Sequence, residues 1–444
     1  MKKGKHRNGT DTNNLKRLRV LLNCLSIHPF KGSEWAVGWN FAINLAKVCD
    51  VTVMCPDWMF FDQKNDILTE IVRYPDLKIK FVFVPLMERE ISKFSETIRK
   101  DGVSILSQFI IYTTYKRWMK RAYLKAKEML PNYNFDIVHQ LTMTGFREPG
   151  YLYKLGIPFV WGPIGGMASI PLNFLPHLDL KTLTVRGPQA IINYLQIIFG
   201  RAKFASKKSD IIYAIGPEEE KVISQIWKRK CYRLIETGTS CEIPPLERNY
   251  HNNRPLIIGS TSGHGDRRKG LFILIKAIAA LNDYPIEVKI VGEGVETSYL
   301  RQLVTKHNLD KAVYFIGKVE HSQIKECLYS FDVFVHPSLL DGTPHSVIEA
   351  LSSGLPVICH DIRGLNLAIN DKCGIKIPLK SMKQSVEGIR NGIKYFMQNP
   401  GKVNEMSKAA IRRSGELTWA KLAGEISKGY IEVIEKNTSK KGLS

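Results

Sequence analysis

The sequence predicts an α/β protein made of two doubly wound domains, and three observations support this. Short apolar segments alternate with segments of helical periodicity along nearly the whole chain, which is typical of parallel sheets covered by helices. The alternation breaks once, at residues 236–253, where Thr, Pro, Asn and His predominate. The 444 residues also exceed the size of one ordinary domain. We therefore expect two domains of similar size.

Each expected strand is an apolar run bounded by Gly, Pro or polar residues. In the first domain, strands are predicted at residues 19–26, 51–55, 78–84, 135–140, 158–161 and 210–214, and helices at 34–47 and 91–130. In the second domain, strands are predicted at residues 256–261, 287–291, 313–316, 333–335 and 357–359, and helices at 271–281 and 419–434. Ligands bind at the carboxyl ends of strands in such sheets, so the loops after strands are where functional side chains are expected.

The composition is that of an ordinary globular protein, with 44% hydrophobic and 24% charged residues. We find no apolar run of the roughly 18 to 20 residues that a membrane helix needs. The basic N-terminus is followed by polar residues where a signal peptide has an apolar core, so a cytoplasmic location is expected. The eight cysteines contain no C-x-x-C pair, and buried thiols are favoured over a zinc site or disulfides.

A net charge of +22 predicts an acidic partner, such as a nucleic acid, an anionic membrane surface or a polyanionic substrate. The charge gathers in a basic tail, residues 1–18, and in a basic segment, residues 115–127. No nucleic-acid-binding module is recognised, so nucleic acid is disfavoured. In the second segment, apolar residues that include Trp118 and Leu124 can share one helical face beside the cations. Two interpretations stay open: a membrane-interface helix, or an ordinary amphipathic helix with a solvated basic face.

Two carboxylates, Asp341 and Glu349, flank a turn between two apolar strands near the end of the chain. A Gly/Pro turn that ends a strand and opens a helix directs backbone N–H groups at one point, which favours an anion. Carboxylates can accept hydrogen bonds from sugar hydroxyls beside it, so a nucleotide-sugar pocket is indicated. A structural explanation also stays open, because Ser346 and Glu349 match a helix capping box and Asp341-Gly342 is a common turn.

Two Gly-containing loops follow predicted strands. The loop from Gly263 to Gly270 is cationic, and its Arg267, Arg268 and Lys269 suit a diphosphate, although it lacks the Walker A order. In the other loop, Gly32 allows the backbone to approach a phosphate at the start of a helix. A solvated basic turn and a plain strand–helix turn are the respective alternatives.

The segment that begins at Asp341 resembles the signature of glycosyltransferase family 4, retaining enzymes of the GT-B fold. That family has Glu-x7-Glu, followed by Ala and a Gly-x-Pro-Val strand. Here Asp341 and Glu349 have this spacing, and Ala350 and Gly354-Leu355-Pro356-Val357 follow. The departure is Asp for the first Glu, which is one methylene shorter.

The other loops resemble the same family. Lys269-Gly270 matches its Arg-x4-Lys-Gly motif, with His264 at the position of the arginine, so that either Arg267 or Arg268 could supply the guanidinium. Gly32-Ser33-Glu34 resembles its Gly-Gly-x-Glu loop. His139, at the end of a predicted strand, matches the family's histidine, although a histidine at a strand end is more often structural.

The resemblance implies a GT-B fold, with two Rossmann-like domains that face a central cleft. It places an acceptor-side domain at residues 19–240, a nucleotide-sugar-binding domain at 241–415, and a C-terminal helix that returns to the first domain at 416–444. It implies His139, Asp341 and Lys269 as catalytic residues, the first two at the donor sugar. It implies donor-binding roles for Gly32, Arg267, Arg268, Lys269, Gly292, Gly342 and Glu349, with Glu349 at the ribose and Gly292 near the base.

The function expected from this resemblance is retaining sugar transfer from a nucleoside diphosphate to a glycan or a polyprenyl-diphosphate-linked acceptor, without a cofactor or an essential metal. A bacterial polysaccharide pathway at the inner face of the plasma membrane fits the basic segment 115–127. The alternatives are another GT-B enzyme, such as an epimerase or a phosphorylase, or a basic nucleic-acid-binding protein.

Overall fold

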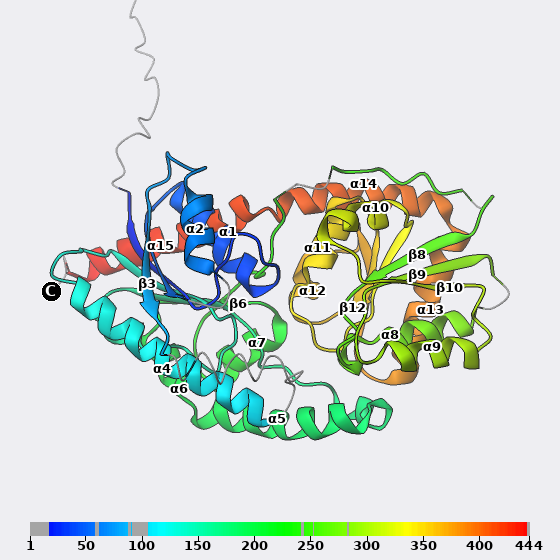
Figure 1. The fold of residues 1–444 in the computed structure, drawn as a ribbon, viewed down its shortest axis with the longest axis horizontal. Coiled ribbons are helices and arrows are strands. Elements are labelled where there is room, and N and C mark those ends of the chain that lie inside the picture. Colours follow the sequence, from blue (N-terminus) through cyan, green and yellow to red (C-terminus); the bar gives the residue numbers. More distant parts are fainter. Residues whose placement is uncertain are drawn as a thin grey trace, which may run out of the picture.

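The structure is a computed structural model, and it describes residues 17–57, 62–87, 90, 105–240, 244–251, 253–281 and 284–441. Most of the basic tail therefore lies outside the described residues, as do residues 91–104 of the expected long helix. Two α/β domains lie side by side along the long axis of the molecule (Figure 1). This confirms the predicted fold class.

The first domain contains a seven-stranded parallel sheet in the order β3-β2-β1-β4-β5-β6-β7. Its strands are β1 (Arg19–Cys24), β2 (Asp50–Asp57), β3 (Ile79–Pro85), β4 (Ile137–Thr142), β5 (Phe159–Ile164), β6 (Ile211–Ala214) and β7 (Tyr232–Arg233). From β1 the chain adds β2 and β3 on one side of the sheet, and it then adds β4 to β7 on the other side. The loop after β1 therefore lies at the topological switch point, where ligands of such sheets bind.

The second domain repeats this topology with six parallel strands in the order β10-β9-β8-β11-β12-β13. Its strands are β8 (Leu256–Thr261), β9 (Ile286–Val291), β10 (Val313–Gly317), β11 (Val333–His336), β12 (Val357–His360) and β13 (Gly374–Ile377). Its switch point lies between β8 and β11. The cationic loop after β8 and the loop after β11, which carries Asp341, therefore meet at one place.

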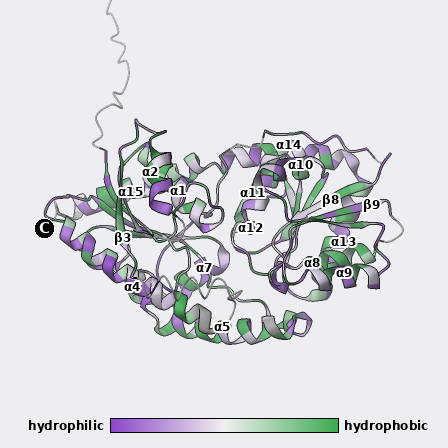
Figure 2. Cartoon of the chain, viewed as in Figure 1, coloured by the Kyte–Doolittle hydropathy of each residue, from purple (hydrophilic) through white to green (hydrophobic). Residues whose placement is uncertain are grey.

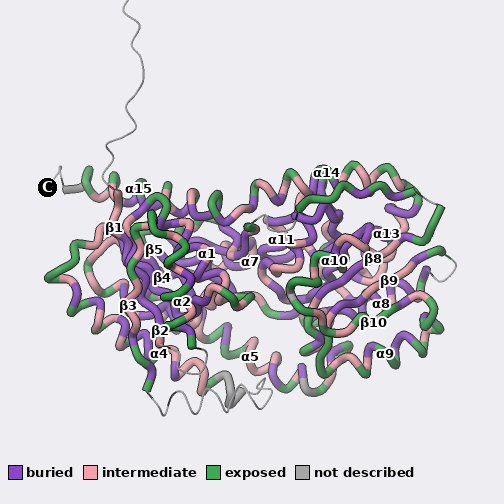
Figure 3. The backbone as a smooth tube through the Cα atoms, turned by 45° about the horizontal axis from the view of Figure 1, so that its top comes forward, coloured by how far each residue is buried: buried purple, intermediate pink, exposed green. Residues whose placement is uncertain are grey.

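Helices cover both sheets, and the buried residues concentrate in the strands and on the inner faces of these helices (Figure 3). In the first domain they are α1 (Glu34–Ala46), α2 (Gln63–Ile71), α4 (Ile105–Met129), α5 (Leu180–Phe199), α6 (Arg201–Lys208) and α7 (Pro217–Lys221). In the second domain they are α8 (Leu271–Ala279), α9 (Thr297–Lys306), α10 (Ile324–Tyr329), α11 (His345–Ser352), α12 (Arg363–Ala368), α13 (Met382–Gln398) and α14 (Pro400–Glu416). Several elements were not predicted from the sequence: strands β7 and β13 and helices α2, α5, α6, α7, α9, α10, α12, α13 and α14.

The last helix, α15 (Trp419–Lys441), leaves the second domain and packs on the first (Figure 1). The ring of Trp419 meets that of Phe41 on α1 edge to face, with centroids 5.3 Å apart. Tyr430 is fully buried and its hydroxyl lies 2.6 Å from Nδ1 of His139 on β4. The final helix is therefore part of the first domain's core.

Helix α4 corrects the membrane interpretation of residues 115–127. Trp118 and Met119 are buried in the core of the first domain, and Trp118 Nε1 donates to the Val84 carbonyl at 2.9 Å. Trp118 and Met119 of the apolar face expected to enter a membrane are thus packed in the protein's own core, whereas Leu124 and the cations Lys116 and Arg117 are exposed. Figure 2 shows that apolar residues lie along α5 instead. Within the described ranges, none of the helices is long and apolar enough to cross a bilayer.

Candidate active site between the domains

The cationic loop after β8 is held against the loop after β11 by close backbone contact. Gly270 has φ 72° and precedes α8 as its N-cap, and a Cβ on it would come within 2.0 Å of the Pro337 carbonyl oxygen. Only glycine fits this left-handed, crowded position. The preceding 3-10 turn, Arg267–Lys269, is capped by Asp266, whose side chain accepts from the Arg268 amide. This turn fixes where the two neighbouring cations point.

Asp341 lies at the centre of a cluster of cations. Its Oδ1 accepts from Arg268 Nη1 at 2.8 Å, and its Oδ2 accepts from Lys269 Nζ at 2.8 Å. The Nε2 of the buried His336 is 3.1 Å from the same Oδ2. Both carboxylate oxygens are therefore engaged. The structure brings Lys269, Arg268 and Asp341 together, as the switch-point argument requires.

The environment of Asp341 determines its charge. Burial alone would raise its pKa, but the hydrogen bond from His336 and the charges of Lys269 and Arg268 outweigh burial and hold the pKa well below its usual value. Asp341 is therefore ionised at neutral pH and acts as a shared counterion for the two cations. This arrangement differs from the expected contact with a sugar, because the carboxylate faces the cations.

The neighbouring residues of the loop point elsewhere. Arg267 Nε lies 3.2 Å from a Glu296 oxygen, and its guanidinium stacks 3.9 Å above the Tyr299 ring. His264, at the position of the family's arginine, is buried with its Nδ1 2.8 Å from the Thr297 hydroxyl. Of the two candidates for the missing guanidinium, Arg268 is therefore the one placed beside Lys269.

The first domain presents a carboxylate at its own switch point. Ser33, which precedes α1, has φ 57°, a conformation that favours the glycine of the family's motif. Glu34 then accepts hydrogen bonds from the Thr144 amide and from the Thr144 hydroxyl, the latter at 3.1 Å. Burial raises the pKa of Glu34, opposed by these Thr144 bonds and assisted by the charge of Glu236.

A cavity of about 380 Å³ lies between the two domains at this place. It is lined by Ser33, Glu34, Val37, Thr144, Glu236, Thr237, Lys269, Asp341, Gly342, Thr343, Pro344 and His345. The loop after β1 therefore lines the cavity from the first domain, and the loops after β8 and β11 line it from the second. This is the cleft predicted from the two-domain organisation.

Sequence reasoning missed Glu236, which it placed in the linker. Glu236 accepts from the Thr343 amide at 2.7 Å and from the Thr343 hydroxyl at 2.9 Å, joining the segment after β7 to the turn that opens α11. A Cβ on Gly342 would lie 2.2 Å from the Glu236 Oε1, so this contact explains the glycine. The only signal in the sequence was an acidic residue at a domain boundary, which is not specific.

Glu349 and Gly32 line a neighbouring cavity of about 550 Å³, which shares Ser33 and His345 with the first. Helix α11 begins at His345, after Pro344, so Ser346 lies inside the helix and the capping-box explanation of Glu349 is wrong. The structure therefore separates the expected site into two adjoining parts. One part contains Lys269 and Asp341, and the other contains Gly32 and Glu349.

His139 does not fit its expected place at the sugar. Its side chain is fully buried on β4, with Nδ1 2.6 Å from the Tyr430 hydroxyl and Nε2 2.7 Å from the Gly162 carbonyl. Burial lowers its pKa to about 4, so the ring is neutral at physiological pH. These contacts make His139 a structural link between the first sheet and α15.

Gly292 follows β9 and has φ 125°, and a Cβ on it would lie 2.0 Å from the Ser262 carbonyl oxygen. A side chain at this position would push β9 away from the loop after β8. The structure thus gives Gly292 a packing reason, and a base-contact role remains a prediction.

Comparisons with known proteins agree with this architecture. Residues 248–413, less than half of the chain, match the family model of group 1 glycosyl transferases. A candidate teichuronic acid biosynthesis glycosyltransferase of Bacillus subtilis, TuaC, is 37% identical over 123 residues, which are 28% of this chain and 29% of that protein. The first curated relatives are matched over 29% to 46% of their own length, so the similarity is concentrated in part of each protein.

Solved structures resemble nearly the whole chain. Sucrose-phosphate synthase from Thermosynechococcus elongatus superimposes with a TM-score of 0.60 at 17% identity, covering 95% of this chain and 100% of that one. Anabaena HepE, solved in complex with UDP and glucose, gives a TM-score of 0.55 at 13% identity, covering 93% and 99%. The chain has the GT-B fold of two-domain glycosyltransferases, and the match to its second domain supports the group 1 glycosyltransferase family.

Proposed function

We propose that the protein is a retaining glycosyltransferase that takes a sugar from a nucleoside diphosphate. One observation carries the proposal: Lys269 and Arg268 share the counterion Asp341 at the switch point of the second domain, beside a cavity closed by the first domain. A diphosphate that enters this cavity would compete with Asp341 for the same two cations. UDP and glucose in the structure of HepE are in keeping with such a donor.

In the proposed reaction, the bond between the sugar's anomeric carbon and the phosphate oxygen breaks, and the acceptor oxygen bonds to that carbon on the same face. The diphosphate leaves with the electron pair, and its departing phosphate oxygen takes up the proton that the acceptor hydroxyl loses. Lys269 and Arg268 stabilise the charge that develops on the diphosphate, because they are fixed before the reaction begins. Glu349 is proposed to hold the ribose, and neither a cofactor nor an essential metal takes part.

The acceptor is proposed to be a glycan or a lipid-linked intermediate of bacterial polysaccharide synthesis, in keeping with the similarity to TuaC, a candidate teichuronic acid biosynthesis glycosyltransferase. A membrane contact would be made by α5, because α4 buries its apolar face. On or next to α5, large apolar side chains are exposed: Leu172 77%, Leu180 76%, Ile191 65%, Tyr194 61%, Leu195 48%, Phe199 75% and Phe204 63%. Lysines 203, 207 and 208 follow on α6, so that cations accompany this apolar surface.

The donor is tested by a thermal-shift screen of the full chain against UDP-, GDP- and ADP-sugars. A ligand that binds only the folded state raises the melting temperature, so one nucleotide series should stabilise the protein. Glu349→Ala should reduce this shift without changing the melting temperature of the unliganded protein. If none of the nucleotides shifts the melting temperature, the proposed donor site is wrong.

The membrane contact is tested by pelleting with vesicles that contain anionic phospholipid, at moderate salt. The double variant Leu195→Ser and Phe199→Ser should remain in the supernatant, while Val295→Ser, an exposed apolar residue of the second domain, should pellet like the wild type. If the wild-type protein does not pellet, the membrane part of the proposal fails. A phosphorylase or an epimerase would instead show dependence on free phosphate, or turnover of the nucleotide sugar without acceptor.

A further inference from the structure

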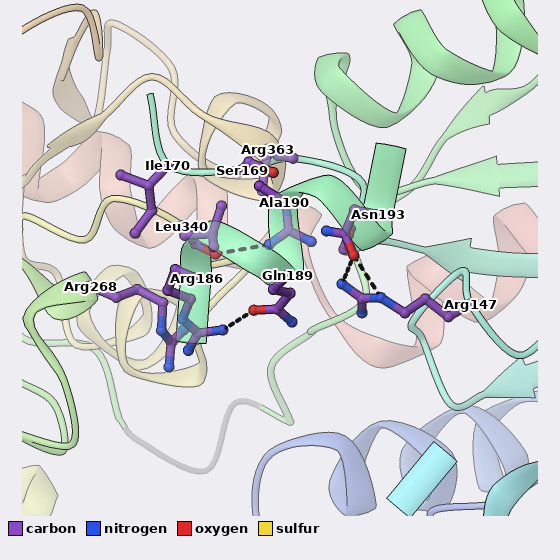
Figure 4. A pocket seen from close by; sticks show the side chains of 12 residues that line it. Arg147, Ser169, Ile170, Arg186, Gln189, Ala190, Asn193, Arg268, Leu340 and Arg363 are labelled. Atoms are coloured by element: carbon purple, nitrogen blue, oxygen red, sulfur yellow. Dashed lines mark hydrogen bonds between the residues drawn. The ribbon is translucent and has the colours of Figure 1, made fainter. Parts of the chain in front are cut away.

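A third cavity, of about 180 Å³, is lined by Arg268, whose Nη1 donates to Asp341 of the proposed donor site at 2.8 Å. Its lining includes Arg147, Arg186, Arg268 and Arg363 (Figure 4). Among the described residues that line it, there is no Asp or Glu. Four guanidinium groups around a small space favour an anion, because each presents several N–H donors and a full positive charge.

Arg147 is oriented without being neutralised. Its Nε donates to the buried Asn193 side-chain oxygen at 2.8 Å, and its Nη1 donates to the Tyr112 hydroxyl at 2.9 Å. The guanidinium also lies 5.3 Å from the Phe146 ring centroid. All of these partners are uncharged, so they fix the direction of the guanidinium and leave its charge available for a ligand.

Arg363 reaches this cavity from the second domain. Only 8% of it is exposed, its φ is 42°, and its backbone amide donates to Glu218 of the first domain at 2.9 Å. Its Nε meets the buried Glu219 at 3.2 Å and its Nη1 donates to the Leu340 carbonyl at 2.9 Å. A non-glycine residue in a left-handed conformation costs free energy, and such strain is commonly found at functional sites.

The two remaining arginines share one counterion. Arg186 Nη2 and Arg268 Nε lie 2.9 Å and 3.2–3.3 Å from oxygens of Asp266. Because Asp341 also serves both Arg268 and Lys269, these carboxylates are divided among more cations than they can neutralise. The positive charge of the cavity is therefore only partly compensated by the protein.

The surroundings indicate what carries the anion. Arg147 also lines a groove of about 290 Å³ between α4 and α5, beside Phe109, Tyr112 and Phe146. Helix α5 contributes Arg186, Gln189 and Asn193 to the arginine cavity, whereas its Ile191 and Leu195 are exposed to solvent. One helix thus borders a cationic cavity on one side and an apolar surface on the other, which suits a molecule with an anionic head and an apolar tail.

We propose that this arginine cavity binds the phosphate or diphosphate group that joins the acceptor to a lipid. That this anion belongs to the acceptor rests on the proposed function, whereas the anion site itself rests on the arginines alone. The donor's diphosphate is assigned elsewhere, because Lys269 faces the larger cavity and the arginine cavity is small for a sugar nucleotide. Arg268 lines the arginine cavity and also donates to Asp341, which lines the larger one, so we infer that it can contact both anions during transfer.

The test is calorimetric titration of the full-length protein with inorganic pyrophosphate, after saturation with the nucleoside diphosphate found in the thermal-shift screen. Pyrophosphate should still bind to the loaded protein. Arg147→Gln should weaken this binding about tenfold or more, since one charge-assisted contact is lost. Asn193→Asp should also weaken it, because the new carboxylate would pair with Arg147. Arg117→Gln, which removes an exposed cation of α4, should leave it unchanged.

A second arm uses geranyl diphosphate in place of pyrophosphate. Tighter binding of geranyl diphosphate supports a lipid-linked anion, and equal affinity would overturn the lipid part of the proposal. If saturating nucleotide abolishes pyrophosphate binding, or if Arg147→Gln and Asn193→Asp bind like the wild type, there is no separate anion site. If no nucleotide binds, the proposed function fails, yet the same titration of the unloaded protein still tests the arginine cavity.

Discussion

The two domains have the same strand order at their switch points, but the side chains there are chemically opposite. In the first domain, Glu34 after β1 is held by the uncharged Thr144 after β4. In the second, the cations Arg268 and Lys269 after β8 are held by the carboxylate Asp341 after β11. At the first site Glu34 accepts from uncharged donors and burial favours its protonated form, whereas the second site shares one negative charge between two cations. An equivalent topology therefore provides a polar wall in one domain and an anion-binding wall in the other.

The largest effect should come from removing the cation of the second switch point that faces the cleft. Lys269→Ala should lower kcat/KM for sugar transfer by roughly 10²- to 10³-fold, because a fixed charge at the departing diphosphate is lost. The circular dichroism spectrum should remain that of the folded wild type. Lys276→Ala, on α8 away from the cleft, is the matched control. Wild-type turnover in Lys269→Ala would remove the donor assignment.

The next effect separates the two adjacent arginines. Arg268→Ala should reduce nucleotide affinity about tenfold or more, since Arg268 lies beside Lys269 and Asp341. Arg267→Ala should change it little, because Arg267 faces Glu296 and Tyr299. Titration calorimetry with the nucleotide measures both. Equal losses in the two variants, or a larger loss in Arg267→Ala, would contradict the assignment.

A smaller effect concerns stability. Asp341→Asn should lower the free energy of unfolding by about 2 kcal/mol near neutral pH, because two partly buried cations lose their shared charge. The pKa of Asp341 is held well below its usual value, so its stabilisation is present above the unfolded-state pKa and is lost as pH falls through the folded-state pKa. Urea unfolding should therefore show wild type and variant converging in acid. A difference that stays constant at low pH would argue against this.

Most of the strands and the loops that follow them could be predicted from the sequence, because their patterns are local. The strands around β1, β8 and β11 were predicted because each is a short apolar run, and the Gly loops after them identified the second switch point. The sequence could not show that Arg268, and not Arg267, lies beside Lys269 on Asp341. The conformation of the 3-10 turn decides in which direction each of these adjacent side chains points. Neighbouring arginines are equivalent in a sequence until that turn is known.

Contacts between distant segments were also beyond the sequence. Arg147 and Asn193 are 46 residues apart, and Arg363 and Glu219 are 144 apart, so nothing in the sequence placed them around one cavity. For His139 the motif predicted a contact with the donor sugar. In the structure, Tyr430 of α15 covers the ring instead. For the basic segment 115–127 two interpretations were open, and the burial of Trp118 and Met119 favours the ordinary amphipathic helix over the membrane helix.

The smallest predicted effect concerns the first switch point. Burial raises the pKa of Glu34, so its protonated form is favoured in the folded protein, and ionisation at higher pH costs folding stability. The stabilisation is complete below the unfolded-state pKa and is lost as pH rises through the folded-state pKa. Glu34→Gln keeps an oxygen for Thr144 and removes the charge, so it should equal the wild type in acid and become the more stable protein at higher pH. Thermal unfolding across this pH range measures the difference. If Glu34→Gln is less stable than the wild type at neutral pH, then Glu34 must receive a compensating charge in the folded protein, and the contrast between the two switch points would disappear.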